Sequence, residues 1–376
     1  MAATLNELCL MALAIEISSA KWIVASMSSG ANKIRRKSLN EETVQARFAA
    51  LLVEMEAARR HLSVPAGARV LVAYEAGQEG FWLVRALREH GIEAEVIDPV
   101  SLPVDRRARR VKTDRVDAEA LVRALLRYMS AERQALRMLR VPSEASEDSR
   151  EWQRERDRLA GTRRGGLDRI GKKLRTQGIW PLPKRWRAQL RGDELRTFSG
   201  KALGEVLAAA LKIELERVEL LETKLKELEE KLPLLDPQAQ RRIDALVQLR
   251  GIGPVGARAL STSLFWRAFD NRRQVGACVG LVGTPYDSGT MRQDQGISKC
   301  GDPKLRALLI ELGWLWLRYQ PKSAMAQWFA KRTQGGGKRN KRVMIVAVAR
   351  KLVIALWRYL KDGELPEGAQ FKPQAA

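Results

Sequence analysis

Two aspartates in the first third of the chain have a spacing that suits metal-ion chemistry. Asp114 and Asp117 stand three residues apart, directly after a dense basic segment. A helix is predicted over residues 114–129, and its first turn would point both carboxylates the same way. Like charges this close need a cation or hydrogen-bond donors, and a divalent metal ion that also contacts a phosphate meets that need. The alternative is a capping pair on a solvated helix, because acids in a first turn suit the helix dipole.

Two further acids follow predicted strands. Glu16 ends an apolar run, and Glu75 comes directly after the buried strand predicted over residues 68–74. Strands alternate with helices here, which indicates an α/β sheet whose ligands bind where strands end. Together with Asp114 and Asp117, these acids have the layout with which ribonuclease-H-like folds hold two divalent metal ions, and carboxylates suit Mg²⁺ or Mn²⁺. Each acid alone is more often a solvated carboxylate, so the prediction depends on the coincidence of all four.

The composition favours a polyanionic partner. The chain has 67 Lys and Arg against 44 Asp and Glu, a formal charge of +23. This excess indicates nucleic acid rather than a membrane surface, and no apolar stretch is long enough for a membrane-spanning helix. The three cysteines form no CxxC motif, which argues against zinc fingers and disulfides and suits a reducing cytoplasm. Only two histidines are present, so histidine-based nucleophilic catalysis is poorly supplied.

Basic segments and one glycine turn are the candidate nucleic-acid contacts. Cations before the acidic pair and in the helical region of residues 150–191 would neutralise phosphates. The turn at Gly251 and Gly253 resembles a helix-hairpin-helix element, whose backbone N–H groups approach a phosphate, although a plain helix–helix corner would look the same. The tryptophans of the basic region, Trp152, Trp180 and Trp186, are expected to pack in a core rather than stack on bases. The candidate contacts are Arg106, Arg107, Arg109, Arg110, Lys112, Arg115, Arg163, Arg164, Lys172, Lys173, Gly251, Gly253 and Lys299.

Three regions and a tail are predicted along the chain. They are an α/β domain over residues 1–130, a helical linker over 143–236, a mainly α domain over 240–362 and a tail over 363–376. In the linker, leucines and one valine repeat at heptad spacing from residue 207 to residue 235. The heptads predict either a coiled coil between chains or a helical hairpin within one chain, and the pattern does not separate the two. In the third region, residues 280–289 are expected to form a polar loop.

Six short motifs together resemble the DEDD-type insertion-sequence transposases of the IS110 family. The resemblance runs from about residue 10 to about residue 350. It implies a RuvC-like, ribonuclease-H-like N-terminal domain with a mixed sheet, a helical coiled-coil linker and a C-terminal transposase domain. The motifs stand at residues 14–19, 74–77, 112–118, 249–253, 280–282 and 287–289.

The resemblance also implies a mechanism and partners. The family's four metal-binding acids fall on Glu16, Glu75, Asp114 and Asp117, and its nucleophilic serine falls on Ser288. The implied activity is excision and insertion of an insertion sequence by metal-assisted serine attack on DNA, guided by a structured bridge RNA that pairs with target and donor DNA. The expected partners are therefore DNA, a guide RNA and further copies of the chain, as a homodimer or tetramer, at the nucleoid of the bacterial cytoplasm.

The sequence departs from the family pattern at two positions. Glu16 stands where the family usually has Asp, and its extra methylene moves the ligating oxygen and so alters the metal geometry. Cys300 stands where an Arg is common, and we interpret it as a neutral replacement.

Two other function classes remain open. One is a metal-dependent nuclease or Holliday-junction-resolvase-like enzyme that uses water, and the other is a non-catalytic nucleic-acid-binding protein. On its own, the motif Asp287-Ser288-Gly289 is an ordinary turn. A serine hydroxyl needs a base or a metal ion to become a nucleophile, and no histidine lies near Ser288 in sequence. The acidic group with Mg²⁺ is therefore the expected activator.

Overall fold

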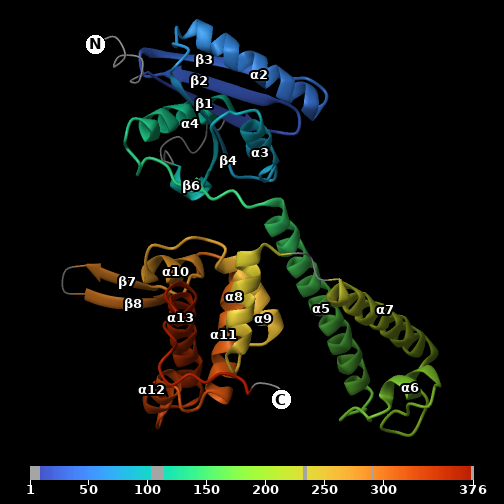
Figure 1. The fold of residues 1–376 in the computed structure, drawn as a ribbon. Coiled ribbons are helices and arrows are strands. Elements are labelled where there is room, and N and C mark those ends of the chain that lie inside the picture. Colours follow the sequence, from blue (N-terminus) through green and yellow to red (C-terminus); the bar gives the residue numbers. More distant parts are fainter. Residues whose placement is uncertain (1–8, 103–113, 232–234, 289–290, 374–376) are drawn as a thin grey trace. The chain divides into compact units, whose positions relative to one another are not determined.

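The computed structural model describes residues 9–102, 114–231, 235–288 and 291–373. The chain divides into two compact units, Met1–Pro142 and Ser143–Ala376, and Figure 1 shows the elements of each. The first unit is a mixed sheet with helices and the second is mainly helical, which confirms the predicted fold class of α/β followed by α. No helix in the described part of the chain is long and apolar enough to cross a membrane.

The N-terminal unit contains a six-stranded sheet in the order β3-β2-β1-β4-β5-β6. The central strands β1, β4 and β5 are parallel, whereas β2, β3 and β6 run antiparallel to their neighbours. Parallel strands carry their carboxyl ends to one edge of a sheet, and this edge is where β1 and β4 end. The strands are β1 (Leu10–Ile17), β2 (Trp22–Ser28), β3 (Ala31–Leu39), β4 (Arg69–Glu75), β5 (Ala94–Ile97) and β6 (Met138–Leu139).

Helices cover both faces of this sheet (Figure 1). Helices α2 (Val44–His61) and α3 (Trp82–Glu89) pack on the face that carries Leu13 and Ile15, while α4 (Asp114–Met129) packs on the other face. Because side chains alternate along a strand, the second face of β1 carries Ala12 and Ala14, and these small residues let α4 approach closely. The helix predicted over residues 114–129 is confirmed.

The second unit begins with a helical hairpin made of α5 (Glu144–Thr176), the short helix α6 (Trp186–Arg191) and α7 (Glu205–Glu230). The heptad residues Leu211 and Val218 are buried against Ile170 and Leu174 of α5. The stripe therefore packs within the chain, which favours the hairpin over a coiled coil between chains. A Cβ atom on Gly166 would lie only 2.6 Å from Val218 Cγ2, so the two helices depend on glycine at this crossing.

The rest of the second unit is a helical core with one β-hairpin. Trp316 is fully buried at its centre, and its indole N–H donates to Ser323 Oγ at 3.0 Å. The segment predicted as a tail runs back over this core, since Phe371 bridges to Leu249. The elements are α8 (Pro237–Gln248), α9 (Pro254–Ala259), the π-helical turn η2 (Leu260–Leu264), α10 (Arg272–Cys278), β7 (Gly283–Ser288), β8 (Met291–Ile297), α11 (Pro303–Tyr319), α12 (Ala324–Thr333) and α13 (Lys338–Asp362).

Candidate active site

Glu16 and Glu75 lie at the carboxyl ends of neighbouring parallel strands. The register pairs Ala14 with Ala73 and Ile15 with Tyr74, so the next residue on each strand is one of the two glutamates. Ala14 and Ala73 belong to the core beneath α4, and side chains two residues apart share a face of a sheet. Both glutamates are therefore on the face that α4 covers. Glu16 is half-buried and Glu75 is exposed.

Helix α4 presents Asp117 on the same face of the sheet. Ala118, the next residue, is fully buried in the core that contains Ala14 and Ala73. Glu119 forms an ion pair with Arg36 of β3 and so faces that side of the sheet. Successive helical residues are about 100° apart, so Asp117 faces away from Glu119, toward the β4 side where Glu75 lies. Asp114 is the first residue of the helix, and its side chain lies outside the described part of the structure.

The donor atoms that this arrangement offers are of the type that a divalent metal ion binds. Its ligands would all be carboxylate oxygens, the hard donors that Mg²⁺ and Mn²⁺ prefer. Among the residues whose side chains are described, no group of three or more His, Cys, Asp or Glu is close enough to hold an ion. Asp114, which would complete the set, is not among those residues. Glu16, Glu75 and Asp117 thus share a face of the fold without forming a closed ligand cage.

Ser288 lies on a β-hairpin, not in the polar loop expected over residues 280–289. It is the last residue of β7 and pairs with Met291 of β8 across the turn. Gly280 and Gly301 lie where the segment that leads into the hairpin contacts the segment that leaves it. Both have positive φ angles, +66° and +99°. A side chain at either position would collide with a backbone carbonyl, of Cys300 and of Cys278 respectively. The loop prediction was wrong because strand pairing depends on a partner segment. The Ser288 side chain lies outside the described part of the structure.

The turn at Gly251 has a packing role. Its φ angle is +85°, and a Cβ atom there would lie 3.1 Å from the carbonyl oxygen of Leu315 in α11. Gly253 precedes α9 and has open space around its Cα atom. This close approach accounts for the glycine at position 251 as part of a helix–helix corner. A helix–helix corner is one of the two interpretations that the sequence allows for this turn.

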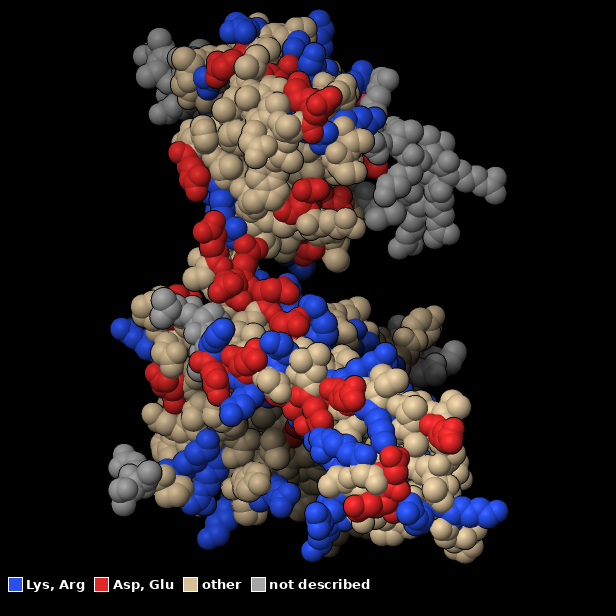
Figure 2. All heavy atoms as spheres, turned by 90° about the vertical axis from the view of Figure 1, so that its right-hand side faces the viewer, with Lys and Arg blue, Asp and Glu red and all other residues tan. Residues whose placement is uncertain are grey.

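The predicted basic contacts differ in how far their charge is already balanced. Arg163 lies 3.6 Å from Glu222, and Lys172 lies 2.7 Å from Asp168. Arg164, Lys173 and Lys299 are exposed. Figure 2 shows acidic and basic side chains interspersed on the face of the helical hairpin that it presents. Arg106, Arg107, Arg109, Arg110 and Lys112 lie outside the described residues, as does the side chain of Arg115.

The tryptophans of the basic region do not share one environment. Trp152 is buried, its indole N–H donates to the carbonyl oxygen of Leu228 at 2.9 Å, and the Arg258 guanidinium lies 4.7 Å from its ring. Trp180 has 58% of its surface exposed, with the Arg175 guanidinium 4.9 Å from its ring. The expectation of core packing is therefore confirmed for Trp152 and wrong for Trp180. Burial here depends on the tertiary partner, which residue type alone does not specify.

Comparison with known proteins agrees with these motifs. Residues 243–329 match the model of the Transposase IS116/IS110/IS902 family, and residues 13–177 match a second, DEDD-type transposase model of the same family. The Sinorhizobium fredii protein named transposase y4rJ is 40% identical over 96% of this chain and 94% of its own length. A Pseudomonas aeruginosa protein named as a family 20 transposase is 28% identical over 77% of this chain and 83% of its own length. The predicted resemblance is thus confirmed, and the chain belongs to the IS116/IS110/IS902 family of transposases.

Proposed function

We propose that this transposase cuts and rejoins DNA by attack of the Ser288 hydroxyl on a phosphodiester, assisted by Mg²⁺ (or Mn²⁺) at Glu16, Glu75, Asp114 and Asp117. The observation that carries the proposal is the placement of Glu16, Glu75 and Asp117 on one face of the sheet, where parallel strands end. Bound there, the ion would stabilise negative charge on the phosphate and favour the ionised nucleophile.

The chemistry is an exchange of phosphate esters. Attack by Ser288 Oγ forms an O–P bond, breaks the bond to one deoxyribose oxygen and releases that oxygen as a hydroxyl. A hydroxyl from a second DNA strand then attacks the phosphoserine, which restores the serine and joins the strands. The two steps balance without an external energy source, because one phosphodiester is made for each one broken. A covalent intermediate of this kind splits one difficult transfer into two easier ones.

The family membership supports two further parts of this proposal. A structured RNA that pairs with target and donor DNA would direct the cut, and the formal charge of +23 suits a protein that holds both DNA and RNA. Copies of the chain would act together as a dimer or tetramer on the ends of the element, at the nucleoid. Sequencing of RNA that copurifies with the protein tests the first part, since random cellular RNA would contradict it.

A trapping experiment tests the serine. The protein is expressed with its gene and flanking DNA on a plasmid, purified, incubated with Mg²⁺ and that plasmid, and denatured. We expect a covalent protein–DNA adduct that digestion maps to Ser288. Ser288→Ala should lose both the adduct and the cut, whereas Ser298→Ala, a hydroxyl removed at the base of the same hairpin, should keep both.

The same experiment separates the alternative function classes. Cleavage by Ser288→Ala at the wild-type rate would replace the proposal with a metal-dependent nuclease that uses water. If the wild type, Ser288→Ala and Asp117→Asn all bind the DNA and leave it uncut, the protein is a nucleic-acid-binding protein without this activity.

A further inference from the structure

A cationic groove lies between α10 and α13 in the C-terminal unit. Its volume is about 540 Å³, and its lining includes the apolar side chains of Ala347, Ile354 and Ala355. The lining also includes five cationic side chains, which the motifs of the sequence do not single out. These are Arg272, Arg273, Arg350, Lys351 and Arg358.

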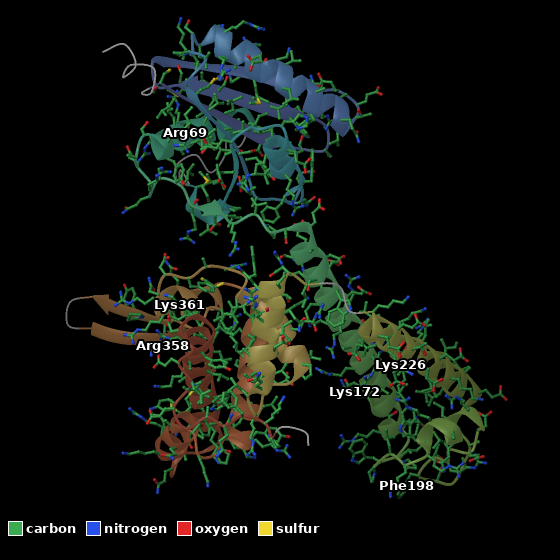
Figure 3. All side chains as sticks on the ribbon, in the orientation of Figure 1. Arg69, Lys172, Phe198, Lys226, Arg358 and Lys361 are labelled. Carbon is green, nitrogen blue, oxygen red and sulfur yellow. The ribbon has the colours of Figure 1, made fainter. Side chains whose placement is uncertain are left out.

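Helix α13 explains how the groove forms. One face of this helix is buried in the core, for example at Val348, Leu352 and Leu356. With 3.6 residues per turn, Arg350, Ile354 and Arg358 fall on the opposite face, where Ile354 is partly buried and all three residues line the groove. Figure 3 labels Arg358 and Lys361 at the end of α13 that lies beside α10. The pattern could have been found in the sequence only by reading α13 as a two-faced helix.

The groove's positive charge is mostly unbalanced within the protein. Arg358 is the one lining residue with an ion pair in the described part of the chain, and its partner Glu364 is 4.0 Å away. Lys351 lies over the Trp328 ring, 4.8 Å from its centre. Arg272, Arg273 and Arg350 have no carboxylate within ion-pair distance among the described residues. In the helical hairpin, by contrast, arginines such as Arg156, Arg169, Arg187 and Arg191 each face a glutamate.

The groove adjoins the hairpin that carries Ser288. A Cβ atom on Gly276 would lie 3.7 Å from Arg350 Nε and 3.5 Å from Val282 Cγ2, so the Arg350 guanidinium reaches α10 close to Val282. Val282 directly precedes β7, and β7 ends at Ser288. Six strand residues span about 20 Å, so the groove lies within a few nucleotides of the hairpin tip.

We propose that this groove binds the phosphodiester backbone of the nucleic acid that passes the β7–β8 hairpin. The inference rests on the proposed function only in naming the polymer. Clustered guanidinium groups bind phosphate oxygens in bidentate fashion, and apolar side chains in the same lining suit sugar rings between phosphates. Five cations around one cavity repel one another, and a polyanion relieves that repulsion by more than a single small anion can.

Binding measurements with matched charge removal test the groove. Arg272→Gln/Arg273→Gln removes two exposed cations of the groove, and Arg217→Gln/Lys226→Gln removes two exposed cations of α7, so the net charge changes equally. Both are made in a Ser288→Ala background, so that binding is measured without cleavage. The probes are a duplex DNA, its single strand and an RNA of the same sequence, followed by fluorescence anisotropy over a range of salt concentrations.

We expect the groove variant to bind at least one probe about 10-fold more weakly and to lower its log–log salt slope by roughly 2, because two phosphate contacts are lost. The control should bind within about 2-fold of the parent, and both variants should melt at the parent's temperature. Loss on DNA alone identifies the DNA strand as the occupant, and loss on RNA alone identifies the RNA. Equal binding by groove and control variants on all three probes overturns the inference. A failed adduct experiment would remove the role of Ser288 and leave this binding result unchanged, so the two proposals fail separately.

Discussion

Glu16 and Glu75 stand next to each other at the ends of parallel strands β1 and β4, because Ile15 pairs in register with Tyr74. A shift of one residue in this register would turn one of the two glutamates away from α4. The fold therefore places two of the predicted ligands on one face before any metal ion binds.

Asp117 and Glu119 provide a matched pair of substitutions on α4. Asp117→Asn should lower DNA cleavage by roughly 100-fold or more, because the proposed metal ligand on the β4 side loses its charge. Glu119→Gln breaks the partly exposed ion pair with Arg36, and we expect near-normal cleavage and a loss of less than about 1 kcal/mol in the free energy of unfolding. Cleavage rates at saturating Mg²⁺ and urea denaturation measure the two effects. Equal cleavage by the two variants would show that Asp117 is not part of the site.

Glu16 tests whether the longer side chain matters. Glu16→Gln keeps the length but removes the charge, and we expect it to abolish cleavage. Glu16→Asp keeps the charge and shortens the reach by one methylene, and it should retain cleavage with a changed ratio of Mg²⁺ to Mn²⁺ activity, because the two ions tolerate different ligand geometries. Cleavage by Glu16→Gln at the wild-type rate would show that Glu16 is not one of the metal ligands.

Gly166 tests the packing of the helical hairpin. Gly166→Ala inserts a Cβ atom 2.6 Å from Val218 Cγ2, and we expect it to lower the free energy of unfolding by about 1–3 kcal/mol. Gly161→Ala on the same helix meets no atom within 4 Å and should raise it by up to about 1 kcal/mol through better helix propensity. Chemical denaturation followed by circular dichroism compares the two. A stabilising Gly166→Ala would mean that α5 and α7 do not cross there.

The ion pair between Arg187 and Glu222 predicts a pH dependence. The hydrogen bond from Arg187 holds the pKa of Glu222 below its usual value of 4.5 and raises the pKa of Arg187. A carboxyl whose pKa is depressed in the folded state stabilises that state fully above its unfolded pKa, and this contribution is lost as the pH falls through the folded pKa. The difference in melting temperature between the wild type and Glu222→Gln should thus be largest at neutral pH and shrink below about pH 4.5. Calorimetry from pH 3 to pH 7 measures it, and a difference that is constant with pH would contradict the assignment.

Much of the N-terminal fold could be predicted from local sequence. The alternation of apolar strands with two-faced helices indicates an α/β sheet, and α4 begins at the residue expected from its acidic first turn. The four acids could be chosen by chain order and motif, because strand ends and a helix start are local features. The motifs also identify the family, which the comparisons confirm.

Other features depended on contacts between distant segments. The heptad stripe of α7 has the same spacing whether its partner is another chain or α5, and only the packing on Ile170 and Leu174 selects α5. Ser288 ends a strand because residues 291–297 pair with it, and a polar segment read alone predicts a loop.

The sequence by itself determined the family, the alternation of strands and helices in the N-terminal domain, and which acids and which serine are candidates, since all of these follow from short motifs and local periodicity. Only the tertiary structure decided that Glu16, Glu75 and Asp117 share one face, that Trp180 is exposed and that five cations gather between α10 and α13. The physical reason is that register, burial and the pairing of charges are properties of segments in contact, and residues far apart in sequence acquire them only when the chain packs.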